Sequence, residues 1–151
     1  MVKNSGANYQ RLVELAVQEA TKLRELTTES EKAKLYPNSI WAKSRTSCIY
    51  GQISGHCFSD RAHELMKICA PRVYERPDNK NLVDCRLTPT TKSVRRAIES
   101  RDDIATRTRY WSPIEVLITM WDDPFGPNFN SDNMVNLAKY IKGEIAEFVL
   151  E

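Results

Sequence analysis

The residues most able to do chemistry gather in one stretch of the chain. All cysteines and histidines fall between residues 48 and 85, and they are Cys48, His56, Cys57, His63, Cys69 and Cys85. A structural zinc site takes four such ligands and usually shows two closely spaced pairs. Here His56 and Cys57 are adjacent, where both rarely bind one ion. His63 and Cys69 would point to different sides of a helix. The spacing favours buried thiols over a metal site, and we expect no cofactor.

A second interpretation of the same stretch is that it contains a thiol nucleophile. Cys57 stands just before a predicted helix capped by Ser59, and the N-terminal end of a helix lowers a thiol pKa. His63 lies one turn into that helix, and Asp60 is nearby. Catalysis also needs a group that orients the imidazole and donors for an oxyanion, and no motif marks Asp60 for either role. A thiol enzyme built on these residues is therefore the weaker alternative to a loop thiol beside a solvent-facing histidine.

Basic and aromatic residues occur together between positions 92 and 111. The candidates for nucleic-acid contact are Lys92, Arg95, Arg96, Arg107, Arg109, Tyr110 and Trp111. A cationic helix face could follow a phosphate backbone while the aromatic rings stack on bases. Acidic residues in the same stretch and a pI near 8.3 argue against a dedicated nucleic-acid module. A solvated helix face, or pairing with acidic residues of the same chain, is the favoured interpretation.

Charge is distributed unevenly along the chain. The formal net charge is +2 over 151 residues. Residues 38–111 hold 14 basic and 8 acidic side chains, whereas residues 112–151 hold 2 and 7. Such segregation indicates either attraction within the fold or a charged partner.

Composition predicts one globular domain over residues 1–151, with residues 1–6 as a flexible N-terminus. Hydrophobic residues make up 41% and charged residues 28% of the chain, which is close to the globular average. No run approaches the roughly 18 apolar residues that a membrane span needs, and the start lacks the apolar core of a secretory signal. We therefore expect a cytoplasmic protein with reduced thiols and no membrane contact.

Apolar periodicity predicts a mainly α fold, a bundle of about five to six helices with a small β-hairpin near 73–87; an α+β fold is the alternative. Gly143 would lie inside the last helix. The predicted helices cover residues 7–27, 39–55, 59–70, 90–102, 112–121 and 130–149, and residues 29–36 either extend the first helix or form a short second one.

The strongest local signal is the sequence Ser112-Pro-Ile-Glu115. It combines a serine N-cap, a proline at the first helical position and a glutamate that can reach back to the cap amide. The helix that follows is apolar on nearly every side, so it is either the central buried helix or half of a partner interface. The residues proposed for such an interface are Ile114, Leu117, Ile118, Trp121 and Phe125.

No motif for binding phosphate or dinucleotide, for a zinc protease or for a serine hydrolase occurs in the chain. We therefore interpret it as a small non-enzymatic protein, a regulator or inhibitor, that acts by contact with another protein or with itself. Nucleic-acid binding through the basic 92–111 face is the alternative function.

Overall fold

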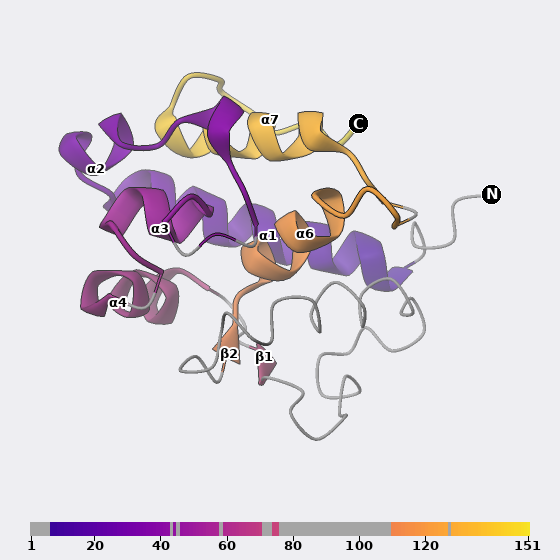
Figure 1. The fold of residues 1–151 in the computed structure, drawn as a ribbon, viewed down its shortest axis with the longest axis horizontal. Coiled ribbons are helices and arrows are strands. Elements are labelled where there is room, and N and C mark those ends of the chain that lie inside the picture. The colour runs from indigo at the N-terminus through magenta and orange to yellow at the C-terminus, as the bar shows by residue number, and fades with distance from the viewer. Residues whose placement is uncertain are drawn as a thin grey trace.

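The fold is seen in a computed structural model that describes residues 7–42, 44, 46–57, 59–70, 74–75, 110–126 and 128–151. These residues are mainly helical, as predicted (Figure 1). No helix among them is long and apolar enough to cross a membrane. The elements are α1 (Ala7–Leu26), α2 (Glu29–Ala33), a 3-10 helix η1 (Pro37–Ser39), α3 (Ile49–Ser54), α4 (Asp60–Cys69), β1 (Tyr74–Glu75), β2 (Tyr110–Trp111), α6 (Pro113–Trp121) and α7 (Ser131–Lys142).

Helix α1 is the longest element and contacts α4, α6 and α7. Its buried face includes Leu12, Ala16 and Leu23, each fully buried, at helical spacing. Leu26, at the end of the helix, is 44% exposed. The α1 stripe forms one wall of the core, and Figure 1 shows it running behind α6.

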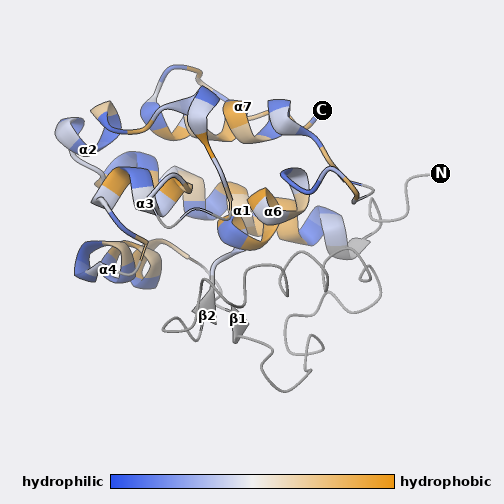
Figure 2. Cartoon of the chain, in the orientation of Figure 1, coloured by the Kyte–Doolittle hydropathy of each residue, from blue (hydrophilic) through white to orange (hydrophobic). Residues whose placement is uncertain are grey.

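Helix α6 lies at the centre of the core, and every residue from Pro113 to Trp121 is buried. The predicted capping box is present: the Ser112 hydroxyl accepts from the Glu115 amide, and the Glu115 carboxylate accepts from the Ser112 amide, each at 3.2 Å. Figure 2 shows α6 mostly in hydrophobic colours, whereas α1, α4 and α7 mix both kinds. Of the two predicted roles for this helix, the structure shows the central buried one.

The predicted helix over residues 39–55 is wrong in most of its length. Among the described residues of that range, only Ser39, the last residue of η1, and the short α3 are helical. The side chain of Gln52 supplies hydrogen-bond partners to backbone groups before and within this range. It accepts from the Tyr36 amide at 2.6 Å and donates to the Ser39 and Ser47 carbonyls at 3.0 Å. A side chain that replaces backbone partners leaves no periodic trace in the sequence.

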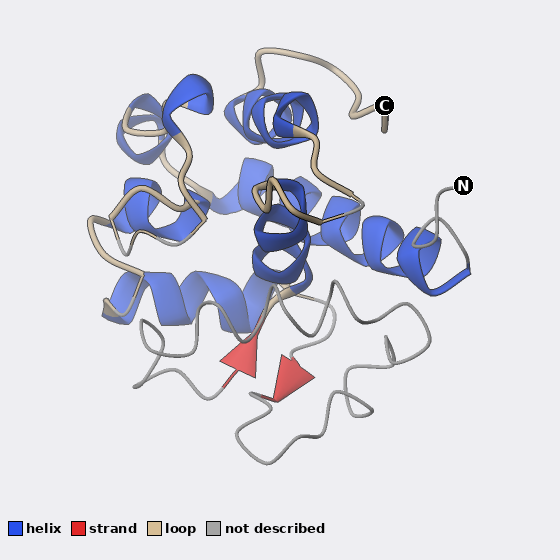
Figure 3. Ribbon diagram, turned by 45° about the vertical axis from the view of Figure 1, so that its right-hand side comes forward, coloured by secondary structure: helices blue, strands red, loops and turns tan. Residues whose placement is uncertain are grey.

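The β structure also differs from the prediction. Strand β1 pairs antiparallel with β2, which is distant in sequence, with Tyr74 opposite Trp111 and Glu75 opposite Tyr110. The other half of the predicted 73–87 hairpin lies outside the described residues, as does the predicted helix over 90–102. Figure 3 shows the two strands together, where β2 leads into α6.

The last helix ends earlier than predicted. Gly143 is its C-cap, with a left-handed φ of 83°, rather than an interior residue. Glycine adopts this conformation without the steric cost that a Cβ brings. Arg24 of α1 secures the turn, because its Nη1 donates to the Ile145 carbonyl at 2.9 Å and its guanidinium lies 4.9 Å from the centre of the Tyr140 ring.

Candidate interaction surface

Large aromatic side chains are exposed at the C-terminal end of α6. Trp41 is 69%, Phe125 85% and Phe129 52% exposed. We call these three residues the aromatic end. Aromatic side chains on a surface are the commonest anchors of protein–protein interfaces, because each buries a large area with few rotatable bonds.

Hydrogen bonds hold the segments of the aromatic end together. The Ala42 amide donates to Asp122 Oδ2 at 3.1 Å, which places the backbone beside Trp41 against the end of α6. The Asn130 amide donates to the Trp121 carbonyl at 2.9 Å, so the loop between α6 and α7 begins and ends at the same point. This bond fixes the two ends of the segment that carries Phe125 and Phe129 beside the last turn of α6.

The segment after α7 returns to the same end of the molecule. The Glu151 amide donates to Asn133 Oδ1 at 3.0 Å, and Asn130 Nδ2 donates to the Glu151 carbonyl at 3.3 Å. The C-terminus accordingly lies near the start of α7 in both views (Figures 1 and 3). Val149, which is 65% exposed, belongs to this returning segment.

Trp121 supports this surface from inside. It is fully buried, its Nε1 donates to the Tyr9 hydroxyl at 2.9 Å, and its ring centre lies 6.1 Å from that of Phe148. Burial raises the pKa of Tyr9, which therefore stays a neutral phenol that can accept this bond. The indole anchors the last turn of α6 to α1 and to the returning segment.

Asn128 is the one polar side chain of the loop that the described residues leave unsatisfied. Its amide nitrogen is buried and has no hydrogen-bond partner in the described part of the chain. A buried donor without a partner costs about 1–3 kcal/mol and is rare in folded proteins. This cost falls between the exposed side chains of Phe125 and Phe129.

Four of the five predicted interface residues are not on the surface. Ile114, Leu117, Ile118 and Trp121 are fully buried against the rest of the chain, so they have no area to offer a partner. Their apolar character comes from the central position of α6. Phe125 alone is exposed, and Trp41 and Phe129 join it although the sequence reasoning did not select them.

The cysteines and histidines do not assemble into a metal site in the described residues. No group of three or more potential ligands occurs there, and Cys85 lies outside. Cys48, Cys57 and Cys69 are buried and none is in a disulfide bond. Cys48 acts as the N-cap of α3, with Sγ accepting from the Gly51 amide at 3.3 Å. Burial raises the pKa of the Cys69 thiol to about 11, which disfavours the thiolate that a metal needs.

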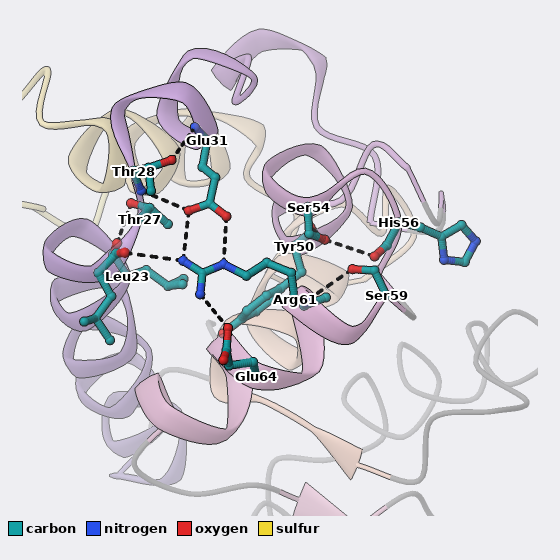
Figure 4. A network of polar contacts seen from close by, with 12 residues as sticks. Leu23, Thr27, Thr28, Glu31, Tyr50, Ser54, His56, Ser59, Arg61 and Glu64 are labelled. Atoms are coloured by element: carbon teal, nitrogen blue, oxygen red, sulfur yellow. Dashed lines mark hydrogen bonds and ion pairs between the residues drawn. The ribbon is translucent and has the colours of Figure 1, made fainter.

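The thiol-enzyme arrangement lacks access for a substrate. Cys57 is 3% exposed and belongs to the apolar core, whereas His63 and Asp60 are exposed on α4. Ser59 is the N-cap of α4, as predicted, and accepts from the Ala62 amide at 3.1 Å. Figure 4 shows the imidazole of His56 directed away from the neighbouring polar contacts.

The nucleic-acid candidates are almost entirely outside the described residues. Only the backbone of Tyr110 and Trp111, in β2, is described. That interpretation of the 92–111 stretch therefore stays a prediction.

A polar network fixes α4 to the junction of α1 and α2. Arg61 binds Glu31 through two contacts, Nε to Oε2 at 2.8 Å and Nη2 to Oε1 at 3.0 Å, and binds Glu64 at 2.6 Å (Figure 4). Glu31 also completes the capping box of α2 with Thr28. The bond to Arg61 lowers the pKa of Glu31. One guanidinium bridges two carboxylates here, and these contacts hold α4 against the junction of α1 and α2.

Glu19 of α1 carries a fully buried carboxyl group that was not predicted from the sequence. A signal for it existed: Glu19 continues the helical spacing of the buried residues Leu12, Ala16 and Leu23.

Comparison with known protein families, curated proteins and solved structures finds no match to this chain.

Proposed function

We propose that this chain is a non-enzymatic binding protein whose aromatic end docks a partner protein that presents an apolar segment flanked by lysine or arginine. The observation that carries the proposal is the exposure of Trp41, Phe125 and Phe129 on segments that hydrogen bonds join at one end of α6. Exposed aromatic residues that gather in one place are typical of docking surfaces.

Charge supports a basic partner. Residues 112–151 hold 7 acidic and 2 basic side chains. Asp132, Glu147 and Glu151 are exposed near or beyond the ends of α7, whereas Lys142 is engaged with the Leu35 carbonyl at 2.6 Å. Complementary charge speeds encounter and excludes like-charged partners, and aromatic rings attract cationic side chains. Lys43 and Arg45, which follow Trp41, lie outside the described residues.

Synthetic peptides test the proposal directly. Three peptides share the same leucine and proline residues and differ only in flanks of lysine and arginine, serine or glutamate. We expect the basic peptide to shift amide NMR signals of residues 41–42 and 122–130, and to bind more weakly as NaCl rises. The triple variant Trp41→Ala, Phe125→Ala, Phe129→Ala should bind at least about tenfold more weakly, as expected when anchor residues are truncated.

A matched variant controls for loss of apolar surface as such. Leu26→Ala with Ile68→Ala removes two exposed apolar side chains remote in sequence from the aromatic end, and it should bind the basic peptide normally. Binding that is equal for all three flanks, or equal in the triple variant, contradicts the proposal. Self-association of the free chain that the triple variant abolishes would assign the surface to a second copy instead. Oligonucleotide binding unaffected by the triple variant would favour the basic 92–111 face.

A further inference from the structure

Glu19 joins three parts of the chain at the start of α6. Its Oε1 accepts from the Ile114 amide at 2.9 Å, and its Oε2 accepts from the hydroxyl of Tyr50 on α3. The Ser112 hydroxyl also bonds to the carboxyl group. Glu19 thus caps a helix distant in sequence, at the point where the chain re-enters the core after β2.

Among the described residues, none of the groups that shift the pKa of Glu19 is a cation. The titratable groups whose pKa is coupled to that of Glu19 are Tyr50 from α3, Cys69 from α4 and the buried Glu115 from α6. No group from α7 is among the causes of the shift at Glu19. All three are neutral or negative. An ionised carboxylate here would lie in a dry core beside a second carboxyl group, which is strongly unfavourable.

The hydrogen bonds act in the opposite direction but are weaker. Amide and hydroxyl donors favour the ionised form, whereas burial favours the neutral one. Burial has the larger effect and raises the pKa of Glu19 to about 8, with a further contribution from Glu115. The hydroxyl of Tyr50 stays protonated because burial raises its own pKa.

We propose that Glu19 is a proton-dependent latch, whose neutral carboxyl group seats the start of α6 in the core and whose ionisation in water favours release of that start together with β2. A carboxyl group that reaches solvent returns to its ordinary pKa near 4.5. Opening therefore releases a proton at every pH between about 4.5 and 8, and the opening constant rises up to tenfold for each pH unit in that window. Above about 8 it levels off, because the closed state is then ionised as well.

Hydrogen exchange measures this opening locally. We would follow amides at the start of α6 by hydrogen–deuterium exchange between pH 5.5 and 9, after correction for the intrinsic pH dependence of exchange. In the wild-type chain their protection should fall about 70-fold from pH 5.5 to 7.5 and level off above about pH 8. In Glu19→Gln, a neutral side chain of the same shape, protection should be independent of pH. Glu25→Gln, on the exposed face of α1, should behave as wild type.

Three results would overturn the proposal: the same pH dependence in Glu19→Gln, none in the wild-type chain, or exchange at the start of α6 no faster than in α7. The last would mean that the start of α6 opens only when the whole chain unfolds. Should Glu19→Gln not fold, an NMR titration of the Glu19 side-chain carbon in the wild-type protein decides the matter. A measured pKa of Glu19 near its ordinary value of 4.5 would contradict the proposal.

Discussion

The two ends of α6 are held in the fold by different kinds of contact. At its N-terminal end the helix is tied to α1 by polar contacts in a dry environment, through Glu19, Ser112 and Glu115. At its C-terminal end an apolar anchor, Trp121, holds a loop that carries exposed rings. The first end stabilises the fold in a way that depends on protonation, and the second leaves apolar area in water. We therefore expect substitutions at the N-terminal end of α6 to change stability, and substitutions of the exposed rings at its C-terminal end to change binding.

The largest effect is expected at the apolar anchor. Trp121→Ala removes a fully buried ring and leaves the Tyr9 hydroxyl without its donor, so the free energy of unfolding should fall by about 3–5 kcal/mol. Urea unfolding followed by circular dichroism measures this. Trp41→Ala, at an exposed position, should change it by less than about 0.5 kcal/mol. Equal losses would mean that Trp41 also supports the core.

The polar end should give stability a distinctive pH dependence. The pKa of Glu19 is higher in the folded chain, about 8, than its ordinary 4.5, so its contribution is fully present below 4.5 and is lost as pH rises through 8. The free energy of unfolding should fall by about 1.4 kcal/mol per pH unit at the steepest. Urea midpoints at several pH values test this, and Glu19→Gln should flatten the curve. A wild-type curve that rises over this range would contradict the assignment.

A smaller loss is expected from the cap itself. Ser112→Ala removes the hydroxyl that accepts from the Glu115 amide and bonds to Glu19, which should cost about 1–2 kcal/mol. The exposed capping box of α2 provides a matched control. Thr28→Ala should cost less, because water can replace the lost bond there. Thermal unfolding of both variants checks the order, and a larger loss in Thr28→Ala would reverse the comparison.

The smallest effect on stability is expected at the loop. Phe125→Ala should change the free energy of unfolding by less than about 0.5 kcal/mol, since the ring is 85% exposed. Its binding to the basic peptide should nevertheless weaken. Parallel unfolding and titration measurements on one sample separate these effects. A marked loss of stability would show that the ring packs within the chain.

Local signals predicted the helices whose ends are fixed by neighbouring residues. The caps at Ser59 and Ser112 lie within a few positions of the amides that they bind, so the sequence displays them directly. The buried face of α1 is visible in the sequence too, because its apolar residues recur at helical spacing. Gly143 was also a local signal, because a glycine is common just after the end of a helix. The apolar residues that follow it led to the wrong prediction that the helix continues past Gly143.

Features made by distant partners were not predictable in this way. The bond from Glu19 to Ile114 and the pairing of β1 with β2 join segments whose proximity exists only in the folded chain. Of the candidate surface, Phe125 was predicted, but Trp41 was not, because nothing local relates it to Asp122. Apolar residues of α6 were assigned to an interface since burial inside a chain and burial between chains give the same pattern.

The antiparallel pairing of β1 with β2 has a consequence for the tolerance of the chain to change. Glu75 and Tyr110 face one another, so the polypeptide leaves the helical core and rejoins it about one strand spacing away. The two positions that bracket residues 76–109 are therefore close in space. A flexible linker put in place of those residues would meet a loop-closure entropy cost that grows by only about 0.6 kcal/mol for each doubling of its length.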